Sequence, residues 1–245
     1  MMKFEKPLRE GVVVNRPNRF IMNVLVDGVL TTCHCPCTGR IARVIFDGKV
    51  PCLLRSAEDE KRRTRYTVEA ISLNEVNDPH KKWIGINQTR ANNYIDYFLR
   101  SGQLSDIIGL KGKDFSLKRE QRVGESRLDF VIDDEIYLEV KSPMVLLPLR
   151  DDYVTGKYVR FTESEHLYSI DRFIKHMGEL SKHKRAIILV FFMFEADIFD
   201  PKPDENSTVG SVVQKTRRSG VEFWQVNAKF TEKGISLVDY YRMPS

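Results

Sequence analysis

The chain has 245 residues and a mass of 28.5 kDa, and its 39 lysines and arginines against 34 aspartates and glutamates leave a net charge of +5. This length permits one large or two small domains with buried cores, and the mild positive excess favours a polyanionic partner. No apolar run approaches the roughly 20 residues that cross a bilayer, and the first residues lack an apolar signal segment. We therefore expect a cytoplasmic protein without a membrane partner.

Three of the four cysteines lie in the short segment Cys33-His34-Cys35-Pro36-Cys37. Zinc ligands normally come in pairs separated by a tight turn, whereas alternate residues of a strand place thiols about 7 Å apart on one face. Reduced, partly buried thiols in a cytosolic protein are therefore favoured over a zinc site.

Short strands are predicted from Arg19 to about Val76, with turn signals at Asp27-Gly28, Thr38-Gly39 and Asp47-Gly48. This pattern is typical of a small β-barrel. Basic residues interleaved with the strands could follow the phosphates of a nucleic acid or form a solvated face, and the sequence supports both interpretations equally. They are Arg16, Arg19, Arg40, Arg43, Arg55, Lys61, Arg62, Arg63 and Arg65.

The composition shifts after Trp83, and a helix is predicted over Gln88 to Leu99 with Thr89 available as its N-cap. We therefore place a barrel domain at residues 1–84 and a second domain at 85–245. Strands around a tight turn are expected within Phe115 to Lys141.

The remaining elements alternate between helices and strands. A helix is predicted over Glu165 to Leu180, with an apolar face and an opposite face that carries Arg172, Lys175, His176 and Glu179. A buried central strand at Ala186 to Phe194, a basic helix that ends at Gly220, and two strands near Glu222 to Val226 and Ile235 to Tyr240 complete the pattern. The order indicates an α/β layer architecture.

The segments Ser126 to Ile132 and Ile136 to Lys141 read as a β-hairpin. With a period of two, the apolar side chains share a core face, and Arg127, Asp129, Glu139 and Lys141 share the other. A turn centred on Asp134 places Asp129 directly opposite Glu139, with the two carboxylates about 5 Å apart.

Like charges opposite one another destabilise a hairpin by up to about 1 kcal/mol, unless a divalent cation lies between them. One or two carboxylates, with water and substrate phosphate, suit Mg²⁺ or Mn²⁺. Lys141 could then orient the attacking water and stabilise phosphate charge. The alternative is a solvated strand face with an ordinary Glu139–Lys141 ion pair.

The chain resembles the SfsA (sugar fermentation stimulation) family nearly from end to end. The order and spacing of several short motifs carry the resemblance: Arg19-Phe20, Asp27-Gly28, His34-x-Pro36 with Thr38-Gly39-Arg40, the Tyr66 strand, Gly85-x-Asn87-x-Thr89 with Ala91-Asn92, Glu120 to Phe130, Glu139-Val140-Lys141 and Lys175-His176-x-x-Glu179-Leu180. The resemblance implies an N-terminal OB-like barrel and a C-terminal, restriction-endonuclease-like domain of the PD-(D/E)xK type with a mixed central sheet. It also implies DNA binding, with Asp129, Glu139 and Lys141 as the catalytic signature.

The resemblance extends to residues around this signature. Glu120 matches a family glutamate and could be a third metal carboxylate or a surface charge. Phosphate contacts are expected from Arg127 and Lys175, together with Arg19 and Arg40 in the barrel. His176 fits a helix-surface or core histidine better than a proton carrier. Asn92 could bond either to the site or to local backbone groups.

The chain departs from the family pattern at two places. Cys37 stands where the family has asparagine, and Arg160 to Ser164 replaces the family's Phe-Pro-Asp-Ala segment after a longer loop. The missing aspartate could remove a metal or substrate contact.

Two functions follow from these observations. The first is a nuclease that uses Mg²⁺ or Mn²⁺ to hydrolyse phosphodiester bonds of DNA, RNA or both. The alternative is a non-catalytic DNA-binding regulatory protein linked to sugar (maltose) metabolism, and a homodimer stays open in either case.

Overall fold

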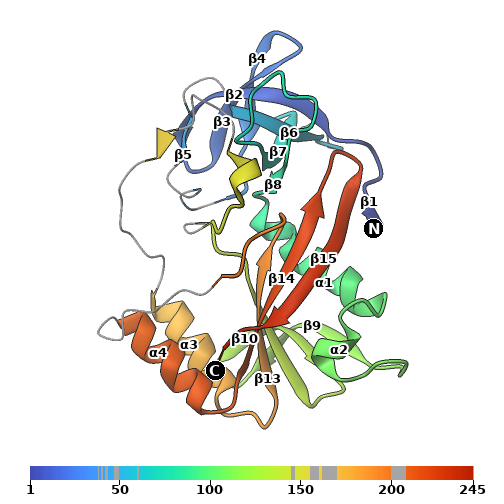
Figure 1. Cartoon of the computed structure of the whole chain (residues 1–245), viewed down its shortest axis with the longest axis vertical. Helices are drawn as coiled ribbons and strands as arrows, with labels where there is room; N and C mark the ends of the chain where they lie inside the picture. Colours follow the sequence, from blue (N-terminus) through green and yellow to red (C-terminus); the bar gives the residue numbers. More distant parts are fainter. Residues whose placement is uncertain are drawn as a thin grey trace.

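The computed structural model describes residues 1–37, 39, 41, 44–46, 50–59, 61–144, 147–154, 160–161, 170–199 and 208–244. A small β-barrel and a larger sheet flanked by helices are stacked along the long axis of the molecule (Figure 1). In the part of the chain that is described, no helix is long and apolar enough to cross a membrane.

The N-terminal barrel is a six-stranded sheet in the order β4-β3-β2-β6-β7-β8, closed by one parallel pair between His34 and Thr67. Positive φ angles of 51° at Asp27 and 80° at Gly28 form the predicted turn between β3 and β4. The other two predicted turns include Thr38 and Asp47-Gly48, which lie outside the described residues. The strands of this sheet are β2 Arg9–Asn18, β3 Ile21–Val26, β4 Val29–His34, β6 Val50–Ser56, β7 Tyr66–Ile71 and β8 Ile84–Gly85, and the short strand β5 Val44–Ile45 lies outside it.

The C-terminal domain is built on a seven-stranded sheet in the order β1-β15-β14-β13-β11-β10-β9. Strands β11, β13 and β14 are parallel and the others pair antiparallel, so the sheet is mixed, as the resemblance implies. Strand β1 lies in this sheet, although residues 1–84 are predicted to form the barrel domain. The strands are β1 Met2–Lys3, β9 Leu117–Val123, β10 Ser126–Ile132, β11 Ile136–Lys141, β13 Ala186–Phe192, β14 Glu222–Phe230 and β15 Gly234–Arg242, and β12 Arg160–Phe161 pairs with β5.

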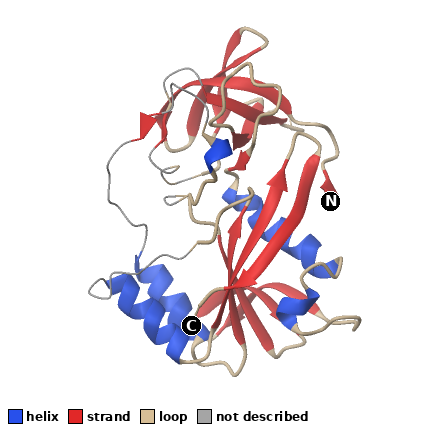
Figure 2. Cartoon of the chain, in the orientation of Figure 1, coloured by secondary structure: helices blue, strands red, loops and turns tan. Residues whose placement is uncertain are grey.

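Helices cover both faces of this sheet (Figure 2). Alternate residues of β13 divide between the two faces: Ile187, Leu189 and Phe191 belong to the core beneath α1, and Ile188, Val190 and Phe192 belong to the core beneath α3 and α4. The strand is therefore buried on both sides, as predicted. The helical elements are η1 Gln88–Arg90, α1 Ala91–Arg100, α2 Ser105–Ile108, η2 Asp151–Tyr153, α3 Ile170–Leu180 and α4 Thr208–Arg218.

One predicted helix start differs from the structure, and another falls on residues outside the described part. Arg90 occupies the N-cap position of α1 without a side-chain cap, and the Thr89 hydroxyl donates instead to Asn87 Oδ1 at 2.6 Å. Thr89 lies in the 3₁₀ turn, one residue before the N-cap position of α1. Helix α3 is described from Ile170, and the predicted residues 165–169 lie outside the described part.

The barrel and the sheet meet at β8. The amide of Gly85 donates to the carbonyl of Met193 at 3.0 Å, and a Cβ on Gly85 would lie 2.6 Å from the Cβ of Met193. A buried carboxylate strengthens the junction: Glu69 of β7 accepts from Arg55 Nε at 2.8 Å and from Asn87 Nδ2 at 3.0 Å. Asn87 immediately precedes η1, so the junction positions the N-terminal end of α1.

Candidate metal centre

The β10–β11 hairpin has the predicted register. Asp133 and Asp134 have φ angles of 51° and 58°, and aspartate tolerates this left-handed region better than most residues. Ile132 pairs with Ile136 and Phe130 pairs with Leu138, which brings Asp129 to the level of Glu139.

The alternative interpretation of a solvated second face is wrong at Glu139. Helix α3 covers the second face, so the Glu139 residue is only 2% exposed. Leu128 also departs from the prediction, because it packs with Met177 and Leu180 rather than with Phe130. The hydrogen-bonded register with β11 starts only at Phe130, so Leu128 lies beyond the paired part of the hairpin.

Both oxygens of Asp129 have a donor. The side chain of Asn92 on α1 donates to Oδ1 at 2.7 Å, and the backbone amide of Val140 donates to Oδ2 at 2.8 Å. Burial and the negative charge of Glu139 raise the pKa of Asp129 above its ordinary value, and the two hydrogen bonds oppose this rise. Asp129 is therefore held in one orientation beside a second carboxylate.

The two carboxylate oxygens of Glu139 differ in their hydrogen bonds. Oε1 lies 2.5 Å from Lys141 Nζ and 2.5 Å from His176 Nδ1, whereas the buried Oε2 has no hydrogen-bond partner among the described residues. Burial acts to raise the pKa of Glu139, but the bonds from His176 and Lys141 outweigh it and lower the pKa below its ordinary value. A charged oxygen is thus buried without a partner, which typically costs at least about 1–3 kcal/mol.

The two carboxylates and Lys141 line one cavity of about 480 Å³ between α1, α3 and the hairpin. Its walls include Asp129, Glu139 and Lys141, with Gln88 and Asn92 from the η1–α1 segment and Phe173 from α3. Two carboxylates, one of which has an unpartnered oxygen, form a donor set that fits a hard divalent cation such as Mg²⁺ or Mn²⁺. An amine beside them supplies positive charge for a phosphate.

The structure does not bring Glu120 to this cavity. Its carboxylate forms an ion pair with Arg127, and both side chains are largely exposed. Among the described residues, no group of three histidine, cysteine or acidic side chains is placed to hold a metal ion. A role for Glu120 as a third metal carboxylate therefore requires this ion pair to open.

The predicted phosphate contacts lie at the surface. Lys175 is half-exposed, with Nζ 3.5 Å from Glu125. In the barrel, the guanidinium of Arg19 lies 4.7 Å from the centre of the Phe20 ring, and Phe20 is itself exposed. Arg40 lies outside the described residues. Arg16 is used structurally, because its guanidinium donates to the carbonyl oxygens of residues 19, 37 and 39.

The predicted polar face of α3 is wrong at His176 and Glu179, because both residues are buried. A core histidine with a hydrogen-bond partner is one of the roles expected for His176, and its partner is the carboxylate of Glu139. His176 lies three residues after Phe173 and next to Met177, so it belongs to the sheet-facing side of α3. This i,i+3 spacing from an apolar residue is the signal that could have placed it.

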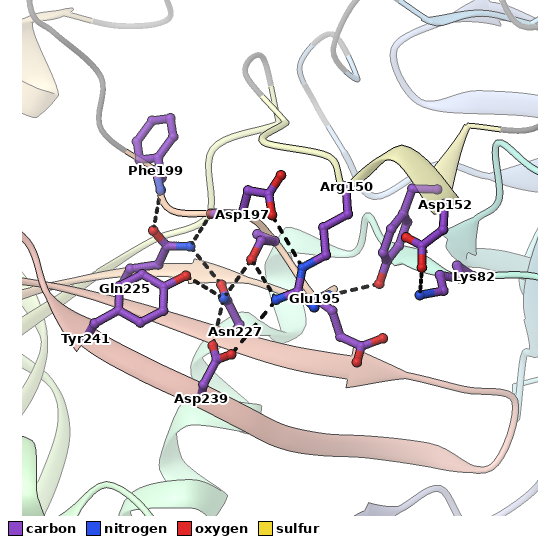
Figure 3. A network of polar contacts seen from close by, with 12 residues as sticks. Lys82, Arg150, Asp152, Glu195, Asp197, Phe199, Gln225, Asn227, Asp239 and Tyr241 are labelled. Carbon is purple, nitrogen blue, oxygen red and sulfur yellow. Dashed lines mark hydrogen bonds and ion pairs between the residues drawn. The ribbon is translucent and has the colours of Figure 1, made fainter.

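A second polar cluster fixes the loops that follow β11 and β13 (Figure 3). Val190 pairs with both Lys141 and Gln225, so the cluster lies two strands from the cavity. Buried Asn227 has three acceptors, the Ala196 carbonyl at 3.0 Å, Asp239 Oδ1 at 2.7 Å and the Tyr241 hydroxyl at 2.8 Å. The Gln225 side chain donates to the Asp197 carbonyl and accepts from the Phe199 amide.

The same cluster reaches the barrel (Figure 3). Arg150 donates to the Ala196 carbonyl at 3.3 Å, and the amide of Glu195 donates to the Tyr153 hydroxyl at 2.9 Å. Asp152 pairs with Lys82, on the approach to β8. The segment 147–154 is therefore tied both to the C-terminal sheet and to the barrel.

Comparison with known proteins agrees with this architecture. The family model of the SfsA N-terminal OB domain matches residues 14–86, and that of the sugar fermentation stimulation protein RE domain matches residues 89–234. The fold and the matches define a protein with an OB barrel followed by a restriction-endonuclease-like domain. The chain belongs to the SfsA family.

Relatives and one solved structure match over most of the chain. Sugar fermentation stimulation protein homologs from Alcanivorax borkumensis and Teredinibacter turnerae are 29% and 28% identical, over 90% and 96% of this chain and 90% and 97% of their own lengths. The structure of Pyrococcus furiosus SfsA in complex with Ca²⁺ is similar with a TM-score of 0.69 and 23% identity, and the alignment covers 96% of this chain and 95% of that one.

Proposed function

We propose that this protein is a divalent-metal-dependent nuclease that hydrolyses phosphodiester bonds of DNA or RNA. The observation that carries the proposal is the cavity in which Asp129, Glu139 with its unpartnered buried oxygen, and Lys141 come together. Membership of a family with a restriction-endonuclease-like domain supports it, as does the Ca²⁺ complex of the P. furiosus relative.

In this proposal Asp129 and Glu139 hold the cation, and Asn92 and the Val140 amide keep Asp129 oriented. A divalent cation, when bound, supplies positive charge that offsets the phosphate and polarises a water molecule. Lys141 lies at the cavity wall and adds a second positive charge for the phosphate oxygens. Hydrolysis joins the water oxygen to phosphorus and breaks one phosphorus–oxygen ester bond, and the released oxygen takes up a proton.

Nucleic acid is the proposed partner of both domains. In the barrel, the exposed Arg19 stacks on the exposed ring of Phe20. The pair offers positive charge for a phosphate and an aromatic ring for a base. In the nuclease domain, Lys175 and Arg127 are exposed basic side chains of α3 and β10. A cytoplasmic location and a homodimer stay predictions.

Cleavage of end-labelled single-stranded and double-stranded DNA and RNA with Mg²⁺ or Mn²⁺ tests the proposal. We expect cleavage by the wild type, and its loss in both Asp129→Asn and Lys141→Ala. Asp134→Asn is the matched control, because it neutralises an aspartate in the turn of the same hairpin and asparagine tolerates the φ angle of 58°. Its cleavage rate should equal that of the wild type.

The alternative function gives a different pattern. A folded wild type that binds DNA in a salt-sensitive manner, but cuts none of the four substrates with either metal, would contradict the nuclease and favour the regulatory protein. Cleavage that persists in Asp129→Asn would contradict the assignment of the site.

A further inference from the structure

The contact between His176 and Glu139 joins a covering helix to the proposed metal site. The His176 residue is 5% exposed, and its Nδ1 lies 2.5 Å from Glu139 Oε1. The same oxygen is 2.5 Å from Lys141 Nζ, whereas Oε2 has no hydrogen-bond partner among the described residues. Both donors therefore act on one oxygen and leave the other free.

We infer that His176 is a positioning residue, which holds Oε1 of Glu139 so that Oε2 is reserved for the divalent cation. The inference rests on the metal site of the proposed function. At 2.5 Å a proton must lie between the ring nitrogen and the carboxylate, because two lone pairs would repel each other. Imidazole is a stronger base than a carboxylate and keeps this proton, so Nδ1 is the donor.

Lys141 alone cannot hold Glu139 in one orientation. It lies on the same strand, and the free end of its flexible side chain can follow the carboxylate as it turns. The imidazole comes from a different element and has a fixed place, because its neighbour Met177 is fully buried in the core between α3 and the sheet. Two donors from separate elements therefore fix a side chain that would otherwise keep several rotamers, a freedom worth up to about 2 kcal/mol.

If His176 had a purely structural role, the effect of replacing it would depend differently on the shape of the new side chain. If His176 only compensated a buried negative charge, its removal would reduce stability and every polar replacement would act alike. A positioning role requires a donor at the place of Nδ1. The amide nitrogen of asparagine occupies nearly that place, whereas the amide nitrogen of glutamine corresponds to Nε2.

Titration calorimetry of the full chain with Mn²⁺ separates these roles, with wild type, His176→Ala, His176→Asn and His176→Gln. Removing the partner of a metal ligand typically weakens metal binding by about 10-fold to 100-fold, which we expect for His176→Ala and His176→Gln. His176→Asn should recover most of the affinity. The control is His183→Ala, which removes a histidine that stacks on Tyr137 at 3.8 Å and does not line the cavity.

Circular dichroism must first show that the variants are folded. The titration then distinguishes the following outcomes. Equal Mn²⁺ affinity in wild type and His176→Ala overturns the inference, and so does an equal loss in all three His176 variants. A wild type that binds no Mn²⁺ overturns both the inference and the metal site. Mn²⁺ binding with the expected order of variants, but without cleavage of any nucleic acid, overturns the nuclease alone and leaves the positioning role intact.

Discussion

The side chain of Asn92 reaches from the first turn of α1 to Oδ1 of Asp129, at 2.7 Å. This bond connects the helix that follows the barrel to one of the two carboxylates of the proposed metal centre. Because the Val140 amide holds the other oxygen, Asp129 is fixed in one orientation without the help of a cation.

Replacement of Asn92 by alanine should weaken divalent-cation binding by about 10-fold, the lower end of the range for residues that orient metal ligands. Asn93→Ala is the matched control, since the neighbouring asparagine accepts from Arg119 at 2.7 Å and does not line the cavity. Mn²⁺ titration measures both. Equal affinity in the two variants would contradict the role of Asn92.

The buried amide of Asn227 should contribute strongly to stability. Asn227→Ala removes the amide donor of the Asp239 carboxylate and leaves the Ala196 carbonyl with Arg150 alone, and we expect the free energy of unfolding to fall by about 1–3 kcal/mol. Urea denaturation measures the change. Asn23→Ala on the exterior of the barrel is the control and should change it by roughly 0.5 kcal/mol or less. A similar loss of unfolding free energy in both variants would show that the buried cluster stabilises the protein no more than an exterior contact does.

Two glycines should respond to alanine with opposite signs. Gly85→Ala places a Cβ 2.6 Å from Met193 Cβ at the junction of the barrel and the sheet, and should destabilise the protein by about 1–3 kcal/mol. Gly178 lies within α3 with nothing within 4 Å of an added Cβ, so Gly178→Ala should stabilise the protein by about 0.5–1 kcal/mol. Thermal unfolding tests both, and a stable Gly85→Ala variant would contradict the close approach of the two domains.

The cysteines of the barrel should react slowly in the folded protein. Burial raises the pKa of both Cys33 and Cys37 to about 11. At pH 8 the fraction of reactive thiolate is then roughly two-hundredfold lower than for a free cysteine with a pKa of about 8.5. Labelling with iodoacetamide should accelerate sharply on unfolding in urea, and rapid labelling of the native protein would contradict the burial of these thiols.

The same shift predicts a pH dependence of stability. A thiol whose pKa is higher in the folded than in the unfolded state keeps its proton longer when folded, so its stabilising effect is complete below the unfolded value of about 8.5. It is lost as the pH rises toward about 11. The free energy of unfolding should therefore fall over this range, and substitution of Cys33 and Cys37 by alanine should reduce the slope.

The sequence by itself determined the hairpin, its register and its three signature residues. Alternation along β10 and β11 and the two aspartates of the turn act over a few residues, so short-range rules suffice to align Asp129 with Glu139. The uninterrupted apolar run of β13 likewise determined a strand covered on both faces. The shift in composition after Trp83 indicated two domains, and the family resemblance added that the first is OB-like and the second restriction-endonuclease-like.

Only the tertiary structure decided what surrounds these residues. The alternating pattern of the hairpin is compatible with a solvated second face, and only the docking of α3 buries Glu139 and brings His176 to its carboxylate. The ion pair of Glu120 with Arg127 likewise depends on the conformation of one strand residue, whose φ is 51°. Which helix covers a face is set by contacts between residues far apart in the chain, and local periodicity carries no information about those contacts.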